Sequence, residues 1–306
     1  MKLKGSVLIF LLGVMGIGLF WRADISPYFT LLAKRPCVCD RCLSEGDSLF
    51  DQRFSKFDEP FLSVNYNLSE DNFNWWKDIQ GRGQILSVYR EKVERLFQLV
   101  PASAHVEASS PDRCRTCAVV GNSGNLMKSH YGPLIDFQDF VIRINRGRTK
   151  GYEADVGNRT THRVMYPESA VDIDNTTIPV LFPFKLTDFD WFMKALSTGP
   201  SGRKSKFNKD LVMLLNPAFM RYVHVMWLQK KGHYPSTGFM TVVLALHLCD
   251  EVHVFGFGAD SDGNWSHYWE QLRDKKLKTG GHPGGEEYKM IVELSKHQIL
   301  TFYTGW

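Results

Sequence analysis

The chain has 306 residues, of which 43% are hydrophobic and 23% are charged, a balance typical of a folded globular protein and not of a disordered one. This length is enough for one large α/β domain or two small ones. The formal net charge of +4 is small and the basic residues are dispersed, so the composition does not indicate a nucleic-acid partner.

The N-terminus has the pattern of a membrane anchor. Residues 1–4 include two lysines, and residues 5–21 form an uncharged, largely apolar run that ends at Arg22. Such a run is long enough to span a bilayer, and the preceding lysines favour a cytosolic N-terminus. A cleaved signal peptide is the alternative, but the bulky residues 19–21 make a poor cleavage site. The prediction is a cytosolic tail at 1–4, a transmembrane signal anchor at 5–21, a short stem at 22–36 and a lumenal domain at 37–306.

The six cysteines fit a lumenal domain. An even number beyond a membrane anchor is typical of disulfides in an oxidising compartment, and six cysteines allow 15 connectivities. The alternative is a zinc ribbon, because two pairs have Cys-x-x-Cys spacing, but two cysteines would then be left over. The cysteines are Cys37, Cys39, Cys42, Cys114, Cys117 and Cys249.

Four Asn-x-Ser/Thr triplets permit glycosylation on a lumenal surface without establishing it. They begin at Asn67, Asn158, Asn175 and Asn264.

Short apolar runs alternate with helical patterns along the chain. Residues 84–100 predict an amphipathic helix with one broad apolar face. Beyond Cys114, buried strands are predicted at 118–120, 140–145, 179–182, 211–215 and 251–256, and helices at 217–230 and 237–249. Alternation of this kind predicts a mostly parallel sheet covered by helices.

Two turns lie where such a sheet would hold a ligand. The Gly-rich turn at 121–125 follows the first strand, and the helix N-terminus at Ser236 and Thr237 would leave its amides facing an anion. The first turn matches neither the dinucleotide fingerprint nor the P-loop, so a tight strand-to-helix turn is the alternative to a nucleotide site. For the second turn, the alternative is an ordinary helix N-cap.

Histidines and paired aspartates are the other candidates for chemistry. His267 and His282, the latter with Glu287 five residues on, suit acid–base catalysis, although a lone histidine is more often structural. Many nucleotide-sugar transferases bind a divalent cation through an Asp-x-Asp pair, but so short a triplet also arises by chance. The triplets here are Asp172-Ile173-Asp174, Asp188-Phe189-Asp190 and Asp260-Ser261-Asp262.

Four segments resemble, in order and separation, the sialylmotifs of animal sialyltransferases. The resemblance runs from about Cys37 to the C-terminus and is greatest to the β-galactoside α2,3-sialyltransferases that act on Galβ1-3GalNAc. The large motif matches residues 117–125, 143–145, 151–157 and 166–169, the small motif 234–238, 249–252 and 256–260, the third motif 267–270, and the very small motif His282-x4-Glu287.

This resemblance implies a single Rossmann-like α/β/α domain, a variant of the GT-A glycosyltransferase fold, behind an N-terminal transmembrane helix. It implies CMP-sialic acid as donor substrate, with no metal and no cofactor. It also implies the disulfides Cys37–Cys42, Cys39–Cys114 and Cys117–Cys249, of which the last would tie the large motif to the small one.

The resemblance also assigns roles to individual residues. His282 is expected to be the general base, His267 to donate a hydrogen bond to the phosphate, and Gln80 to bind the acceptor. The residues expected to contact CMP-sialic acid are Asn122, Ser123, Asn145, Tyr234, Ser236, Thr237 and Gly238.

The family's chemistry would follow from these roles. A histidine base would take the proton of the galactose 3-hydroxyl, the leaving phosphate would be stabilised by nearby donors, and attack from the opposite face would invert the anomeric centre. The expected setting is the Golgi membrane, as a single-pass type II protein whose partners are galactose-terminated glycoproteins or glycolipids. A homodimer is left open.

A few positions depart from the family pattern. Leu215 stands where close relatives carry a tyrosine near the phosphate. Ser266 replaces a histidine and creates the Asn264 triplet inside the third motif, and residues 283–285 replace a more acidic segment. These changes put acceptor preference and rate in doubt and motivate the alternative of a catalytically impaired glycan- or nucleotide-binding relative.

Overall fold

The computed structural model describes residues 37–305 except 41, 44–45, 56, 58, 81–82, 105, 108–109, 200–206 and 271–280. The predicted cytosolic tail, signal anchor and stem at 1–36 lie outside the described residues. Within the described ranges, no helix is both long enough and apolar enough to cross a membrane.

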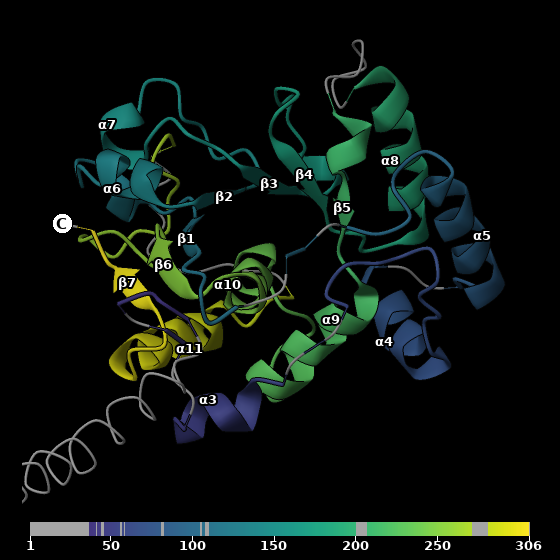
Figure 1. Cartoon of the computed structure of the whole chain (residues 1–306), viewed down its shortest axis with the longest axis horizontal. Coiled ribbons are helices and arrows are strands. Elements are labelled where there is room, and N and C mark those ends of the chain that lie inside the picture. The colour runs from purple at the N-terminus through teal and green to yellow at the C-terminus, as the bar shows by residue number, and fades with distance from the viewer. Residues whose placement is uncertain are drawn as a thin grey trace, which may run out of the picture.

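In the described part of the chain, seven parallel strands form one sheet in the order β5-β4-β3-β2-β1-β6-β7 (Figure 1). The chain moves outward from β1 to β5 on one side and from β6 to β7 on the other, so the order reverses between β1 and β6. Ligands of open α/β sheets bind outside the carboxyl ends of the strands at such a switch point. The strands are β1 (Thr116–Val120), β2 (Phe140–Ile144), β3 (His162–Met165), β4 (Ile178–Leu181), β5 (Met213–Leu214), β6 (Glu251–Phe255) and β7 (Thr301–Tyr303).

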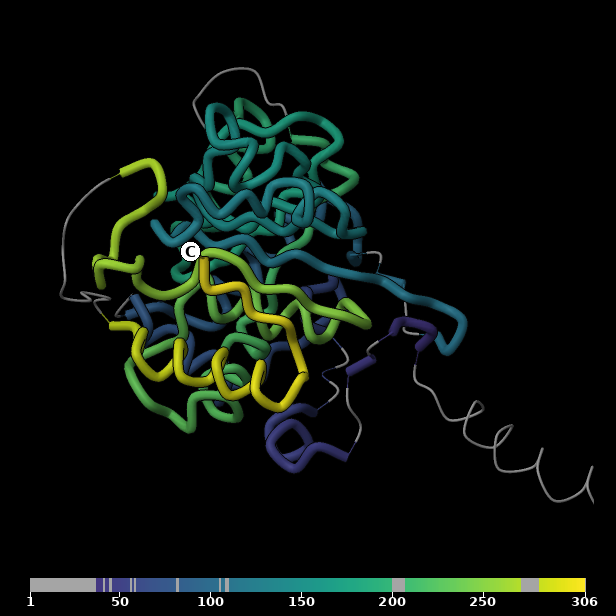
Figure 2. Tube along the Cα trace, turned by 90° about the vertical axis from the view of Figure 1, so that its left-hand side faces the viewer, coloured from purple at the N-terminus to yellow at the C-terminus, as the bar shows by residue number. Residues whose placement is uncertain are grey.

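Helices cover both faces of this sheet, which gives the three layers of an α/β/α domain (Figure 1). Because successive strand residues point to opposite faces, Ala118 and Val120 of β1 join the small core beneath α6 and α7, whereas Cys117 and Val119 join the large core around α10. In the side view of Figure 2, the C-terminal segment with α11 and β7 lies on the surface facing the viewer. The helices are α3 (Ser48–Arg53), α4 (Glu70–Gln80), α5 (Leu86–Phe97), α6 (Gly132–Phe137), α7 (Glu153–Val156), α8 (Leu186–Thr198), α9 (Pro217–Tyr222), α10 (Thr237–Leu248) and α11 (Gly284–Lys296).

The predicted parallel α/β domain is confirmed, but some details of the prediction are wrong, and strand β7 was not predicted. The helix expected at 217–230 ends as α-helix at Tyr222 and continues as one π-helical turn, Val223–Trp227. β3 was missed because His162 and Arg163 interrupt its apolar run, although both side chains are buried. Arg163 is accommodated there because its guanidinium donates hydrogen bonds to backbone carbonyl oxygens.

α10 is the central helix of the domain. Its apolar residues are buried on all sides, and it contacts β1, β6, β2 and β3. The side chain of Ser236 caps its N-terminus, because Oγ accepts a hydrogen bond from the backbone N–H of Phe239 at 3.1 Å. A helix that is apolar all round has to be covered by other elements. Here the sheet covers one side, and Phe54, Phe219 and Tyr222 pack against His247 near the C-terminal end.

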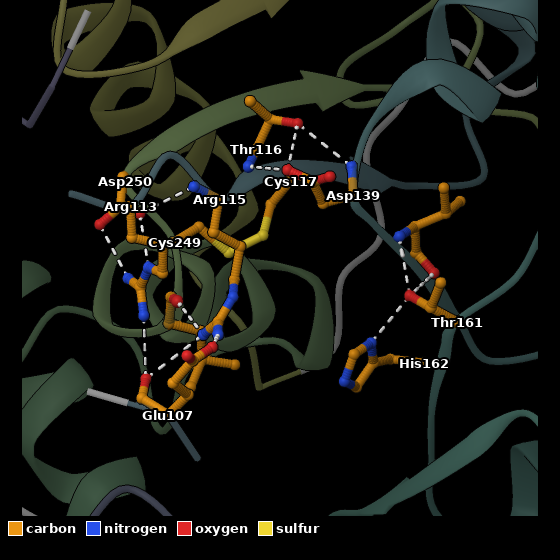
Figure 3. Close-up of a disulfide and its surroundings, with 12 residues drawn as sticks. Glu107, Arg113, Arg115, Thr116, Cys117, Asp139, Thr161, His162, Cys249 and Asp250 are labelled. Carbon is orange, nitrogen blue, oxygen red and sulfur yellow. Dashed lines mark hydrogen bonds and ion pairs between the residues drawn. A yellow bond between two sulfur atoms is a disulfide. The ribbon is translucent and has the colours of Figure 1, made fainter. Parts of the chain in front are cut away.

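All three predicted disulfides are confirmed, so the zinc-ribbon alternative is wrong. Cys117–Cys249 joins β1 to the end of α10, and Figure 3 shows it beside the ion pair of Arg113 and Asp250. Asp250 accepts two hydrogen bonds from that guanidinium, each 2.8 Å long, and a third from the backbone N–H of Arg115. These bonds fix the entry to β1 against the entry to β6.

Removing Cys117–Cys249 by the double substitution Cys117→Ser/Cys249→Ser is expected to lower the free energy of unfolding by about 2–5 kcal/mol. The bond closes a loop of sequence separation 132, whereas Cys37–Cys42 has a separation of 5, and loop-closure entropy grows with loop length. Denaturant unfolding of this variant and of Cys37→Ser/Cys42→Ser measures the difference. A loss for Cys117–Cys249 no larger than for Cys37–Cys42 would contradict this reasoning.

Candidate active site

The turns that follow β1 and β6 touch one another at the switch point. The backbone N–H of Gly121 donates to the carbonyl oxygen of Phe255 at 2.8 Å, and that of Ser123 donates to Gly256 at 3.0 Å. A Cβ atom on Gly121 would lie only 2.3 Å from the Gly256 oxygen, and Gly256 itself has a φ of +71°. Only glycine fits at these two positions, so the predicted Gly-rich turn is required by close backbone packing.

The predicted donor residues of the large motif surround this contact. Ser123 Oγ donates to the carbonyl oxygen of Gly258 at 2.6 Å, and Asn122 Nδ2 donates to that of Ile144 at 3.2 Å. Asn145 follows β2 in the left-handed region, with a φ of 54°, a conformation that asparagine tolerates better than most residues. The Ser169 hydroxyl donates to Oδ1 of Asn145 at 2.9 Å, which fixes the asparagine side chain.

A cavity of about 260 Å³ opens at this edge of the sheet. It brings together most of the predicted site residues from segments far apart in the chain. Tyr166 and Phe184 also line it but were not assigned a role from the sequence; the first belongs to the Tyr-Pro-Glu-Ser segment of the large motif, and the second follows β4. The lining residues are Gln80, Asn145, Tyr166, Phe184, Tyr234, Ser236, Thr237, Gly238 and His282.

A larger hollow of about 860 Å³ lies elsewhere, between α3, the end of α10 and the disulfide Cys37–Cys42. None of the predicted donor, acceptor or catalytic residues lines it. We therefore assign the chemistry to the smaller cavity.

His282 lines the cavity, and one hydrogen bond defines its tautomer. Its Nδ1 lies 3.2 Å from the carbonyl oxygen of Tyr234, and because a carbonyl can only accept, Nδ1 carries the hydrogen. Nε2 is then the nitrogen with the lone pair. Burial lowers the pKa of His282, which keeps the ring neutral near pH 7. The Tyr234 ring packs edge-on against the imidazole, with centroids 4.5 Å apart.

Glu287 supports the cavity from behind. Its carboxylate accepts from the backbone N–H of Ser236 at 2.7 Å and from Ser236 Oγ at 2.6 Å. Only 7% of the residue is exposed, and this burial raises its pKa. The acidic residue of the very small motif therefore acts through Ser236, and it holds the N-terminus of α10 against α11.

His267 lies beside the cavity and does not line it. It pairs with Ser123 as an isolated antiparallel bridge, so the third motif lies on the Gly-rich turn. Its Nδ1 is 2.9 Å from an oxygen of Glu270, and its ring stacks on Trp269 with centroids 4.7 Å apart. Asn122, Ser123 and His267 thus form one cluster next to the cavity.

Comparison with known proteins agrees with this geometry. The family model described as "Glycosyltransferase family 29 (sialyltransferase)" matches residues 61–299. The chain belongs to the sialyltransferase family.

Individual relatives cover most of the chain. A Gallus gallus protein named CMP-N-acetylneuraminate-beta-galactosamide-alpha-2,3-sialyltransferase 1 is 44% identical over 285 residues, which are 89% of this chain and 83% of the relative. The Sus scrofa protein of the same name is 42% identical over 300 residues, covering 92% and 87%. A crystal structure of a mammalian sialyltransferase in complex with Gal-beta-1-3GalNAc-ortho-nitrophenol matches with a TM-score of 0.78 at 40% identity, covering 89% of this chain and 100% of that one.

The Asp-x-Asp pairs of this sialyltransferase serve local structure. Asp174 accepts hydrogen bonds from Thr176 and Thr177, Asp188 forms an ion pair with Lys185, and Asp190 forms one with Lys92. In the third pair, Asp260 accepts from the backbone N–H groups of Asp262 and Asn264. Among the described residues, no group of three or more His, Cys, Asp or Glu side chains is arranged to hold a metal ion.

Two of the positions that depart from the family pattern, Leu215 and Ser266, are buried. Leu215 is fully buried in the large core after β5 and does not line the cavity. Ser266 is buried, and its carbonyl oxygen accepts from the backbone N–H of Gly124 at 2.7 Å. Asn264 is half-buried and donates from Nδ2 to Asp260, whereas the asparagines of the other three triplets, Asn67, Asn158 and Asn175, are exposed.

Glu287→Ala is expected to lower the free energy of unfolding by about 1–3 kcal/mol, because it leaves the backbone N–H of Ser236 without its acceptor in a buried site. Glu287→Gln keeps one acceptor oxygen and should lose less. The neighbouring substitution Glu286→Ala removes surface ion pairs with Lys231 and Lys289, which solvent screens, so its loss of stability should be smaller. Denaturant unfolding of the three variants measures the differences, and equal losses at 286 and 287 would contradict the assigned role.

Proposed function

We propose that this sialyltransferase moves sialic acid from CMP-sialic acid to the galactose 3-hydroxyl of Galβ1-3GalNAc on O-glycans or glycolipids. The relatives in Gallus gallus and Sus scrofa are named for α2,3 transfer to β-galactosamide, and a crystal structure at 40% identity contains a Galβ1-3GalNAc compound. The observation that carries the proposal is the cavity, because it brings His282, Gln80 and the N-terminus of α10 together.

In the proposed reaction His282 is the general base. A sugar hydroxyl is a weak nucleophile, and Nε2 of His282 accepts its proton as the oxygen bonds to the anomeric carbon. The bond from that carbon to the phosphate oxygen breaks at the same time, and CMP leaves with the electron pair. Attack occurs on the face opposite the leaving group, so the configuration inverts and no covalent enzyme intermediate forms.

The leaving phosphate gains negative charge, and two features of the site would stabilise it. The backbone N–H groups at the start of α10, beside Ser236, Thr237 and Gly238, carry the positive end of a helix dipole. His267 engages Glu270 through Nδ1, so a hydrogen bond from its Nε2 to the phosphate requires a ring protonated on both nitrogens. A ring in that form would bring a positive charge to the leaving phosphate. The proposal therefore includes no metal ion.

Gln80 and Tyr234 are proposed to orient the acceptor. Gln80 Nε2 donates to the Tyr234 hydroxyl oxygen at 2.9 Å. Because that oxygen accepts from Gln80, the hydroxyl hydrogen is directed elsewhere and can bond a sugar oxygen in the cavity. The carbonyl oxygen of Tyr234 also orients His282, so one residue links acceptor and base.

The proposed setting is the Golgi membrane, with residues 5–21 as a type II signal anchor and the catalytic domain in the lumen. The three disulfides support an oxidising compartment. The proposed partners are galactose-terminated glycoproteins or glycolipids, and the fold is proposed to be the variant GT-A type. The competing hypothesis is a catalytically impaired relative that binds nucleotide or glycan, and Leu215 and Ser266 motivate it.

The full chain in detergent micelles is expected to transfer labelled sialic acid from CMP-sialic acid to a Galβ1-3GalNAc glycoside with chelator present. An α2,3-specific sialidase should release the label, and Galβ1-4GlcNAc should be a poorer acceptor. Protein that binds CMP but labels neither acceptor would favour the binding-relative hypothesis. Activity that disappears in chelator and returns with a divalent cation would overturn the metal-free reaction.

His282→Ala is expected to lower kcat by about 10²–10⁴-fold and to leave CMP affinity nearly unchanged, because the base acts on the acceptor hydroxyl. The control His297→Ala, which removes an exposed histidine paired with Asp47, should keep full turnover. Burial lowers the pKa of His282 from its usual 6.5, so the imidazole should stay neutral below that pH. The kcat of the wild-type chain should therefore be retained below pH 6.5 and fall only as the pH drops through the lowered pKa of His282. An equal loss of CMP affinity in His282→Ala would contradict the base role.

A further inference from the structure

The helix that carries Gln80 has to be held at a defined distance from the cavity. Gln80 is the last residue of α4, and its side chain reaches Tyr234 across 154 positions of sequence. α4 buries Phe73, Trp76 and Ile79, but apolar packing alone does not fix how far a helix slides along its axis. Directional hydrogen bonds at both sides of the helix supply that constraint.

Two consecutive tryptophans of α4 make these bonds in different directions. Trp76 Nε1 donates to the carbonyl oxygen of Pro183 at 2.8 Å, next to Phe184 in the cavity wall. Trp75 Nε1 donates to Nδ1 of His224 at 3.2 Å. Neighbouring residues of a helix point about 100° apart, so the two indoles attach α4 to two separate parts of the domain.

The hydrogen bonds of His224 define its tautomer. An indole N–H can only donate, so Nδ1 of His224 is the acceptor. Nε2 lies 3.2 Å from the carbonyl oxygen of Gly232, which can only accept, so Nε2 carries the hydrogen. A neutral ring with hydrogen on Nε2 satisfies both contacts. Only 6% of His224 is exposed, and this burial lowers its pKa, which favours the same neutral form.

His224 also lies in the π-helical turn that follows α9. A π-helical turn holds an extra residue and changes the direction in which the following side chains point, and such turns occur frequently at functional sites. The residues on either side of this turn contact α4 at two more points. Arg221 donates to Asn72 Oδ1 at 2.9 Å, and Nε2 of His233 lies 3.1 Å from the carbonyl oxygen of Asp78, in the last turn of α4.

We propose that His224 is a positioning residue for the acceptor substrate: by accepting the Trp75 indole N–H, it sets the position of α4 and so the position of Gln80 opposite Tyr234. This inference rests on the proposed function, in which Gln80 binds the galactose-containing acceptor. Two consecutive hydrogen bonds, from Trp75 to His224 and from His224 to Gly232, connect α4, which ends at Gln80, to the segment before Tyr234. The positions of both residues proposed to orient the acceptor, Gln80 and Tyr234, therefore depend on the imidazole ring of His224.

Kinetics of the full chain in detergent micelles test this, with Galβ1-3GalNAc glycoside and CMP-sialic acid varied separately. Trp75→Phe and His224→Phe each remove the hydrogen bond and keep an aromatic ring. Each should raise the acceptor KM about 3- to 10-fold and leave the KM for CMP-sialic acid and the kcat within about twofold. His224→Asn should restore most of the acceptor affinity, because its Oδ1 occupies the place of Nδ1 and can accept from Trp75.

Two further variants separate positioning from general stability. Tyr222 lies on the same helical segment as His224, but its hydroxyl bonds to Arg53 and Ser55 and not to α4. Tyr222→Phe should therefore lower the melting temperature without raising the acceptor KM. In a Gln80→Ala background, His224→Phe should add little to the acceptor KM, because the residue through which it acts is gone. Additive effects there, or a parallel rise of both KM values, would overturn the inference.

Calorimetric titration with the Galβ1-3GalNAc glycoside in the presence of CMP keeps the test independent of turnover. A wild-type chain that transfers or binds the disaccharide, with His224→Phe and Trp75→Phe indistinguishable from it, would overturn the role of His224 alone. A wild-type chain that neither binds nor transfers to the disaccharide would overturn the proposed function, and the inference with it.

Discussion

The close contact between the turns after β1 and β6 is the constraint on which the site depends. Gly121 and Gly256 approach until a single Cβ atom would not fit between them, and backbone hydrogen bonds then join the two turns. The disulfide Cys117–Cys249 ties β1 to the C-terminal end of α10. This helix begins beside the two turns and packs along the sheet toward its opposite edge. Because α10 begins at Ser236, this arrangement places a helix N-terminus beside the Gly-rich turn, where an anionic donor can be bound.

Buried polar groups complete this framework, and each is held by a partner distant in sequence. Glu287 orients Ser236 from 51 positions away, and Arg163 supports the backbone at Asn145 and Gly147. Burial lowers the pKa of Arg163 to about 10, yet a guanidinium with that pKa still keeps its charge at neutral pH. Charged groups of this kind are costly to bury unless they are hydrogen-bonded, so their presence beneath the site indicates a rigid scaffold.

Much of the fold and the site could be predicted from the chain. Apolar runs indicated β1, β2, β4 and β6, and the resemblance to known sialylmotifs indicated the disulfides and most lining residues of the cavity. Strand β3 could not be predicted, because no local pattern reports that His162 is buried against Phe140 or that Arg163 is buried by hydrogen bonds to distant carbonyl oxygens. Phe184 was missed for a related reason, since one phenylalanine after a strand looks the same in a core as in a cavity wall.

By itself, the sequence determined what depends on near neighbours: the apolar strands, the Gly-rich turn, a helix N-cap at Ser236 or Thr237 and the alternation that makes a parallel α/β sheet. These features arise from local sterics and from the period of hydrophobic residues. Only the tertiary structure decided which distant groups meet, such as Trp75 with His224, 149 positions apart, and which tautomer His282 and His224 adopt. A histidine's tautomer is set by the partners that the fold places around it, and the order of strands in the sheet decides which partners those are.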